Sequence, residues 1–255
     1  MYPILFKIGK FSLCSYSFFI AIGLILGILI VRKEANRTGE DPEKIMDLCF
    51  YLLISAIVGS RLFYMATNPV IFFQDPWEII RIQNGGLVFY GGLIAALITG
   101  LIYMKSTAMP LWKTADMLAP AIAVGQFWGM IGCFFTGCCY GRVSDFPWAV
   151  TFTHPHSLAP TGIPIHPVQL YFALNYLIIY GVLLVFRKYK KFDGQLFWIY
   201  VLLFGVTFAT LETFRGDIQS YSVSGALSVS QTVGAGLAMI AAVMIMLLRK
   251  TPETN

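Results

Sequence analysis

Three cysteines near the middle of the chain are the residues best suited to chemistry. Cys133, Cys138 and Cys139 lie at the end of an apolar stretch, within the glycine-rich sequence GMIGCFFTGCCYGR that runs from Gly129 to Arg142. A thiolate is a nucleophile, and a cation such as Arg142 lowers the pKa of a neighbouring thiol. The spacing therefore favours a reactive thiol centre, in which one thiolate attacks a substrate and its neighbour assists.

The same cysteines allow two other interpretations. Thiolates joined by His154, His156 or His166 would suit zinc or copper, but Cys-x4-Cys-Cys is not a typical ligand spacing, and we assign no metal site. Free cysteines are also small apolar residues that pack well inside membrane proteins. The remaining cysteines, Cys14 and Cys49, are interpreted as packing residues, and five cysteines in all do not suggest a disulfide framework.

Charged residues inside apolar stretches form a second group of candidates, because a charge within a membrane is costly. Arg61 lies late in one stretch and Glu212 late in another, with Arg215 three residues further on and so on the same helical face. Arginine offers a planar fork of donors to a phosphate, which predicts a site for a phospholipid head group that Arg142 would also reach. The alternatives are a structural ion pair for Glu212 and Arg215, and an interfacial, snorkelling side chain for Arg142.

His166, Tyr16 and Tyr90 complete the candidates. His166 opens the sequence HPVQLY, where Pro167 suits the first turn of a helix and Gln169 can offer hydrogen bonds. The alternative for this histidine is an ordinary interfacial position. Judged alone, the two tyrosines favour a packing role.

The composition indicates a polytopic membrane protein. Of the 255 residues, 57% are hydrophobic and 12% are charged, and the mean hydropathy is +0.72; soluble domains carry about 25% charged residues. The net charge of +5 comes from short basic blocks between apolar stretches, a pattern that excludes a nucleic-acid-binding protein. We expect no cleavable signal peptide, because the first apolar stretch is a full span long and lacks a small-residue cleavage pattern after it.

Seven apolar stretches are long enough to cross a bilayer, which takes about 20 residues. They are predicted at residues 13–31, 46–66, 88–104, 116–137, 167–186, 195–213 and 229–248. Glycines interrupt the third stretch, at Gly91–Gly92, and the fourth, so that both can pack closely against neighbouring helices. The sequence thus predicts an all-α polytopic membrane protein with one integral domain over residues 1–255.

Basic residues gather in alternate loops, which predicts the orientation of the chain. Of the 18 Lys and Arg residues, 12 lie in one set of loops, so we expect the N-terminus outside and the C-terminus in the cytoplasm. The cysteines then lie at the outer end of the fourth span. Residues 67–85, amphipathic but too polar to span, predict an interfacial arm, and the Pro- and His-rich residues 140–165 predict a small outer head.

The chain resembles the prolipoprotein diacylglyceryl transferases, bacterial enzymes that move diacylglycerol from phosphatidylglycerol to the lipobox cysteine of a prolipoprotein. The likeness covers nearly the whole chain and keeps the order of its motifs. They are Tyr16, GSRLFY at 59–64, DPWEIIRIQNGGLVFYGGLI at 75–94, DMLAP at 116–120, the GxxGxFxxGxxxGR frame at 129–142, HPVQLY at 166–171, and Glu212 with Arg215. Seven spans with an external N-terminus also fit that family.

The resemblance implies a divergent member. In the family pattern a histidine falls on Tyr90, an arginine on Met130, asparagines on Cys133 and Thr136, a glutamate on Cys138, and a tyrosine and an arginine on Phe204 and Phe208. Five polar residues keep the pattern, namely Tyr16, Arg61, His166, Glu212 and Arg215. The glycine frame is thus retained, while the base and cation residues of the usual reaction are replaced, in part by thiols.

These observations predict a membrane transferase that moves a diacylglyceryl or similar group from a phospholipid to a thiol or another acceptor, through Cys138 and Cys139. The predicted catalytic residues are Cys138, Cys139, Cys133, Tyr90 and Glu212. The predicted substrate-binding residues are Tyr16, Arg61, Arg142, His166 and Arg215. The implied partners are a phosphatidylglycerol-like donor, a prolipoprotein signal peptide or small thiol as acceptor, and the bacterial plasma membrane, with no cofactor. The alternatives are a thiol-redox or metal-binding protein that reuses the fold, and a non-catalytic phospholipid-binding paralogue.

Overall fold

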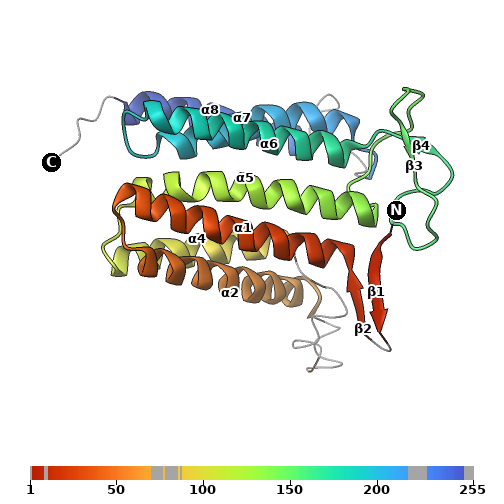
Figure 1. The fold of residues 1–255 in the computed structure, drawn as a ribbon, viewed down its shortest axis with the longest axis horizontal. Coiled ribbons are helices and arrows are strands. Elements are labelled where there is room, and N and C mark those ends of the chain that lie inside the picture. Colours follow the sequence, from red (N-terminus) through yellow and green to blue (C-terminus); the bar gives the residue numbers. More distant parts are fainter. Residues whose placement is uncertain are drawn as a thin grey trace. The chain divides into compact units, whose positions relative to one another are not determined.

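A computed structural model describes residues 2–8, 11–69, 77, 86, 88–217 and 229–249. In this part of the chain, seven helices are long and apolar enough to span a membrane, which confirms the prediction. They are α1 (Ser15–Thr38), α2 (Pro42–Thr67), α4 (Phe89–Ser106), α5 (Leu111–Thr136), α6 (Val168–Phe186), α7 (Gln195–Leu211) and α8 (Val229–Leu248) (Figure 1). The predicted interfacial arm at 67–85 lies outside the described residues, except for 67–69 and Trp77.

The chain forms two compact units, one of Met1–Val31 with Ala115–Asn255 and the other of Arg32–Thr114. In the second unit, α2 and α4 lie side by side (Figure 1). A Cβ atom on Gly91 would lie 2.6 Å from the carbonyl oxygen of Gly59. Only glycine permits so close a contact between the two backbones, as small residues do at membrane helix interfaces, and the prediction of close packing for this helix is confirmed.

The core of the first unit lies between α5, α6 and α7. It includes Ala119 from α5, Phe172 and Tyr176 from α6, and Leu196 from α7. The carboxylate of Asp116 accepts hydrogen bonds from the backbone N–H groups of Gly194 at 2.8 Å and Phe197 at 2.9 Å, and its Oδ2 lies 2.9 Å from Nζ of Lys190. Donors at the start of α7 are thereby satisfied, which ties that helix to α5.

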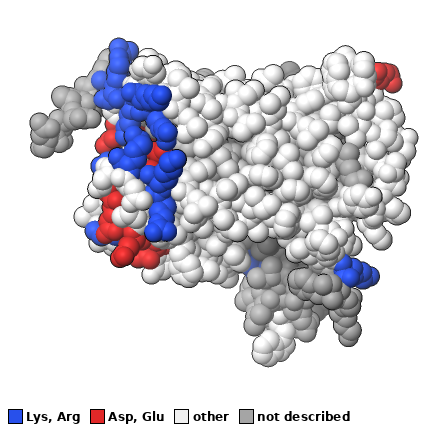
Figure 2. Space-filling model, in the orientation of Figure 1, with Lys and Arg blue, Asp and Glu red and all other residues white. Residues whose placement is uncertain are grey.

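On the face drawn in Figure 2, most of the charged side chains gather in one group, whereas the rest of the described surface in view is mostly uncharged. The predicted end of the first span at residue 31 was wrong, since α1 continues to Thr38 and so includes the basic residues Arg32, Lys33 and Arg37 that were counted among the loop residues. Arginine and lysine favour helices, and Glu34 lies 2.7 Å from Arg37 on the same helix. The predicted orientation across the membrane stays a prediction.

Two short hairpins accompany the helices. The first pairs β1 (Ile4–Ile8) with β2 (Phe11–Cys14), and the second pairs β3 (Val150–Thr151) with β4 (Pro164–Ile165). The segment 140–165 contains the second hairpin and a small buried cluster of Phe152, Ala159 and Ile165, against which Phe134 and Tyr140 pack. The chain after α5 therefore has a core of its own, whose packing fixes the path of the cysteine-containing loop.

Candidate functional site

The loop that follows α5 turns sharply back on the helix. Gly137, just after the last helical residue, has φ of +86°, and Cys139 has φ of +53°, a left-handed conformation that non-glycine residues seldom adopt. A Cβ atom on Gly137 would lie 2.3 Å from Oγ of Ser157 and 2.9 Å from the backbone nitrogen of Ala159. The turn and its tight packing both require glycine at this position, and they direct the next two residues toward the helix.

The turn brings the three thiols together. The Sγ atoms of Cys133, Cys138 and Cys139 all lie within 4.8 Å of one another. Cys133 is buried, and the other two are half-buried. The carbonyl oxygen of Cys138 accepts a 2.7 Å hydrogen bond from Nε2 of Gln169, a fully buried side chain in the first turn of α6. We call these three residues the thiol cluster. Its loop is bonded to α6 through Gln169.

The same loop is bonded to the segment that follows α7. Gly141 pairs with Arg215 as an antiparallel bridge. The backbone N–H of Arg142 donates to the carbonyl oxygen of Phe214, and that of Gly216 donates to Tyr140, both at 2.9 Å. The site is therefore assembled from segments that are far apart in the sequence.

Glu212 and Arg215 form the ion pair that their spacing predicts. Helix α7 ends at Leu211 and the next three residues form a 3-10 turn, yet Nη1 of Arg215 lies 3.3 Å from Oε2 of Glu212. Asp217 binds the other side of the guanidinium, with Oδ2 2.9 Å from Nη2. Oε1 of Glu212 is buried and has no hydrogen-bond partner among the described residues, so one carboxylate oxygen is left for another group.

Electrostatics couple this pair to the thiol cluster. The neighbouring thiols of Cys133 and Cys138 and the guanidinium of Arg215 lower the pKa of the Cys139 thiol despite its burial. Burial alone would lower the pKa of Arg215, but Asp217, Cys139 and Glu212 raise it. A thiolate and a guanidinium therefore stabilise each other at this end of the unit.

Tyr16 and His166 approach the same region. A Cβ atom on Gly132 would lie 3.2 Å from Cα of Tyr16, so the first turn of α1 packs against the last turns of α5. The backbone N–H of His166 donates to the carbonyl oxygen of Arg142 at 2.9 Å, and its Nδ1 lies 3.2 Å from the hydroxyl of Tyr171. The first unit thus contains eight of the ten predicted site residues.

Arg61 and Tyr90 belong to the other unit. Arg61 is only 5% exposed, and its Nη1 donates to the carbonyl oxygen of Gly86 at 3.1 Å, while its guanidinium lies 5.3 Å from the ring centre of Tyr64. Tyr90 is 65% exposed. These contacts support a positioning role for Arg61 within its own unit, and both residues remain predictions as parts of a substrate site.

The list of predicted site residues lacks three contributors, namely Gln169 and Tyr171, which the sequence marks only as able to form hydrogen bonds, and Asp217. The Gln169 side chain holds the thiol loop, and the Tyr171 hydroxyl accepts a 2.7 Å hydrogen bond from Nε1 of Trp148. Asp217 carried a usable signal, because an acidic residue two positions after a candidate phosphate-binding arginine limits that arginine's free charge. The other two could not be paired from the sequence, because their partners are distant in the chain.

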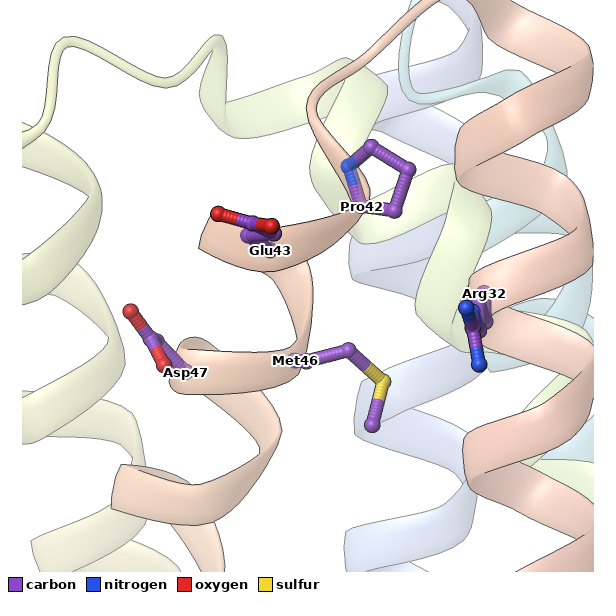
Figure 3. Close-up of a pocket in the computed structure, with 5 residues that line it drawn as sticks. All are labelled: Arg32, Pro42, Glu43, Met46 and Asp47. Atoms are coloured by element: carbon purple, nitrogen blue, oxygen red, sulfur yellow. The ribbon is translucent and has the colours of Figure 1, made fainter.

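A hollow of about 310 Å³ lies in the second unit, lined by Arg32, Pro42, Glu43, Met46 and Asp47 (Figure 3). Glu43 and Asp47 project from the first turns of α2, and Arg32 projects from α1 (Figure 3). None of the predicted site residues lines it. The hollow is open and carries both signs of charge, so it gives no support to a second catalytic site.

Comparison with known proteins decides the family. The sequence profile described as prolipoprotein diacylglyceryl transferase matches residues 3–247. The chain belongs to the prolipoprotein diacylglyceryl transferase family. This finding confirms the resemblance seen in the sequence and, with the seven spans, a location in the bacterial plasma membrane.

Individual members of the family align over almost the whole chain. A protein of Finegoldia magna is 35% identical over 246 residues, covering 96% of this chain and 94% of its own length. A protein of Clostridium tetani is 31% identical over 218 residues, covering 85% of this chain and 86% of its own. A protein of Geobacter sulfurreducens is 29% identical over 253 residues, covering 97% and 95%. All three are named phosphatidylglycerol–prolipoprotein diacylglyceryl transferase.

Proposed function

We propose that this protein is a membrane transferase that moves a diacylglyceryl or closely similar group from a phosphatidylglycerol-like phospholipid to an acceptor thiol, with the thiol cluster as its reacting centre. Membership of the family supports the reaction class. The observation that carries the proposal is the placement of Cys139 within electrostatic reach of Arg215. One end of the first unit thus offers sulfur chemistry beside a cation that suits a phosphate.

The charges of the site suit this transfer. The acceptor thiol must lose its proton to become a nucleophile. Its sulfur then forms a bond to the glyceryl carbon, while the bond from that carbon to the phosphate oxygen breaks and the electron pair leaves on the phosphate. The guanidinium of Arg215 is the group that would stabilise this departing anion, and Glu212 and Asp217 fix its direction.

The thiol cluster could either attack the lipid itself or activate the acceptor thiol, and a comparison of the leaving groups favours activation of the acceptor. Attack by Cys138 or Cys139 on the glyceryl carbon would form a thioether with the enzyme. A second thiol would then have to displace a thiolate from a thioether, and a thiolate is a poorer leaving group than the phosphate monoester that the phospholipid releases. We therefore propose that the cluster activates the acceptor thiol and that Cys133, Cys138 and Cys139 act together.

The test uses the purified full chain in vesicles of phosphatidylglycerol that is labelled in its diacylglyceryl part. The acceptor is a synthetic prolipoprotein signal peptide with one cysteine. We expect label on the peptide sulfur with the unchanged protein and with Cys14→Ser, a cysteine outside the cluster, and a loss of at least about 10²-fold with Cys139→Ser. Transfer at the same rate in both variants would exclude the cluster as the reacting centre.

A further inference from the structure

The thiol cluster has the composition of a metal site. We propose that Cys133, Cys138 and Cys139 bind one zinc ion through their three sulfur atoms and leave the fourth position of the ion to the acceptor thiol. The binding of zinc stands on the cluster alone. The identity of the fourth ligand rests on the proposed transferase function.

The distances suit zinc. Sulfur atoms that each lie about 2.3 Å from a tetrahedral zinc ion are about 3.8 Å apart. The three Sγ atoms already lie within 4.8 Å of one another. The sulfur atoms therefore need to approach one another by only about 1 Å to close the site.

The donor atoms select the metal. Thiolate sulfur is a soft ligand that favours zinc, copper(I) and iron–sulfur clusters, whereas magnesium and calcium take oxygen ligands. Structural zinc sites hold four protein ligands, and sites that bind substrate hold three. Among the described residues, the group of potential ligands consists of these three cysteines. The cluster therefore matches the open kind of site.

The charge balance also suits a zinc ion. Binding releases the remaining thiol protons to solvent and gives a centre of one zinc ion and three thiolates, with a net charge of −1. The guanidinium of Arg215, within electrostatic reach of Cys139, offsets this charge. The half-buried sulfurs of Cys138 and Cys139 leave a side of the centre that a ligand can approach.

The surrounding residues hold the ligands in position. The Gln169 side chain fixes the carbonyl group of Cys138 at 2.7 Å, and the left-handed turn at Gly137 fixes the direction of the loop. Neither contact involves a sulfur atom, so both can persist when the metal binds. Such support around the ligands is typical of metal sites in proteins and strengthens binding.

The acceptor thiol is activated when it binds at the fourth position of the zinc ion. A thiol that coordinates zinc loses its proton to solvent and remains a thiolate at neutral pH. That thiolate attacks the glyceryl carbon as the bond to the phosphate oxygen breaks, and the thioether product is a weak zinc ligand that dissociates. The zinc ion thereby replaces a general base.

The experiment measures zinc directly on the full chain in detergent. The protein is loaded with zinc chloride and dialysed against metal-free buffer, and its zinc content is determined by elemental mass spectrometry. We expect about one zinc per chain for the unchanged protein and for the two controls outside the cluster, Cys14→Ser and Cys49→Ser. Cys133→Ser, Cys138→Ser and Cys139→Ser should bind zinc at least about tenfold more weakly.

A second probe guards against variants that fail to fold. Cadmium bound by thiolates absorbs in the ultraviolet, and its titration into chelator-treated protein should give this absorption with the unchanged chain and the two controls. The cluster variants should unfold at the temperature of the unchanged chain when all are zinc-free. Equal zinc contents in all six proteins would overturn the proposal, and so would binding of copper(I) without zinc.

The outcomes separate this inference from the proposed function. Full transferase activity in zinc-free protein would contradict the assignment of the acceptor thiol as fourth ligand and leave the proposed transferase function standing. If zinc binds through the cluster but no label reaches the peptide, the proposed function and the assignment of the fourth ligand are wrong. The metal site would stand in that case.

Discussion

The Nε atom of Arg142 donates a 3.1 Å hydrogen bond to the carbonyl oxygen of Arg215, a residue 73 positions further along the chain. The backbone of Arg142 also bonds to Phe214 and accepts from His166. The residue thus joins the thiol loop to two other segments. Because the Arg142 side chain is bonded to the backbone of Arg215, it is less suited to bind a phosphate. The Arg215 side chain, which contacts Glu212 and lies near Cys139, is the better phosphate ligand.

Replacement of Arg142 by Ala should therefore have a structural effect. One hydrogen bond from a partly exposed donor is lost, while the two backbone bonds remain, so we expect unfolding to cost about 1 kcal/mol less. Reversible unfolding in mixed micelles measures this change. The phospholipid KM should stay within about twofold, and a much larger rise would assign the side chain to phosphate binding.

Replacement of Gly137 by Ala should distort the thiol cluster. The left-handed conformation alone costs a residue other than glycine about 1–2 kcal/mol, and the new methyl group would also collide with Ser157. The control is Gly162→Ala, whose φ of +78° is similar but whose Cβ would meet no atom within 4 Å. We expect both variants to be destabilised, but only Gly137→Ala to raise the rate at which Cys138 and Cys139 are alkylated.

Gln169→Leu should loosen the loop without removing a thiol. The carbonyl oxygen of Cys138 would lose its partner in a buried setting, which costs about 1–3 kcal/mol. Gln126→Leu is a suitable comparison, because it breaks a 2.8 Å hydrogen bond with Tyr200 in the same unit, two turns before Cys133 on α5. Cysteine mapping by mass spectrometry should show faster alkylation of Cys138 in the first variant alone. Equal rates would mean that Gln169 serves stability only.

Glu212→Gln and Asp217→Asn distinguish the two carboxylates on Arg215. The Oε1 atom of Glu212 is buried and lacks a partner, whereas both oxygens of Asp217 face the guanidinium. We expect Glu212→Gln to lower kcat by about 10²-fold. Asp217→Asn should chiefly raise the phospholipid KM, because Arg215 loses one of the two carboxylates that fix its direction. The vesicle assay reports both constants, and the reverse pattern would reassign the two roles.

The spans could be predicted because each is a long apolar run, and their ends agree with the structure within a few residues except at α1 and α5. The α1 helix passes the last apolar residue because its basic side chains also favour helix. The hairpin of β1 and β2 could not be read from a short, mixed sequence. The backbone N–H of Ser15, at the start of α1, donates to the carbonyl oxygen of Pro3 at 2.9 Å, a contact that no periodic pattern encodes.

The thiol cluster shows where sequence reasoning reaches its limit. A Cys-x4-Cys-Cys spacing is not typical of metal ligands, because regular backbone would separate the sulfurs. The structure brings them together through two left-handed residues, Gly137 and Cys139, which lie on either side of Cys138. The glycine could be foreseen as a helix end, but a left-handed cysteine could not. The pairing of Glu212 with Arg215 was predictable, since a spacing of three survives the change from helix to 3-10 turn.

The bonds between residues 140–142 and 214–216 also set an order of events in biogenesis. All three cysteines emerge from the ribosome well before Arg215, and two further helices, α6 and α7, must be inserted before the bridge from Gly141 to Arg215 can form. A chain that stalls after α6 has its thiols but lacks the segment that pairs with their loop. The thiols are therefore at greatest risk of oxidation during synthesis, and completion of α7 marks the point at which the cysteine loop is secured.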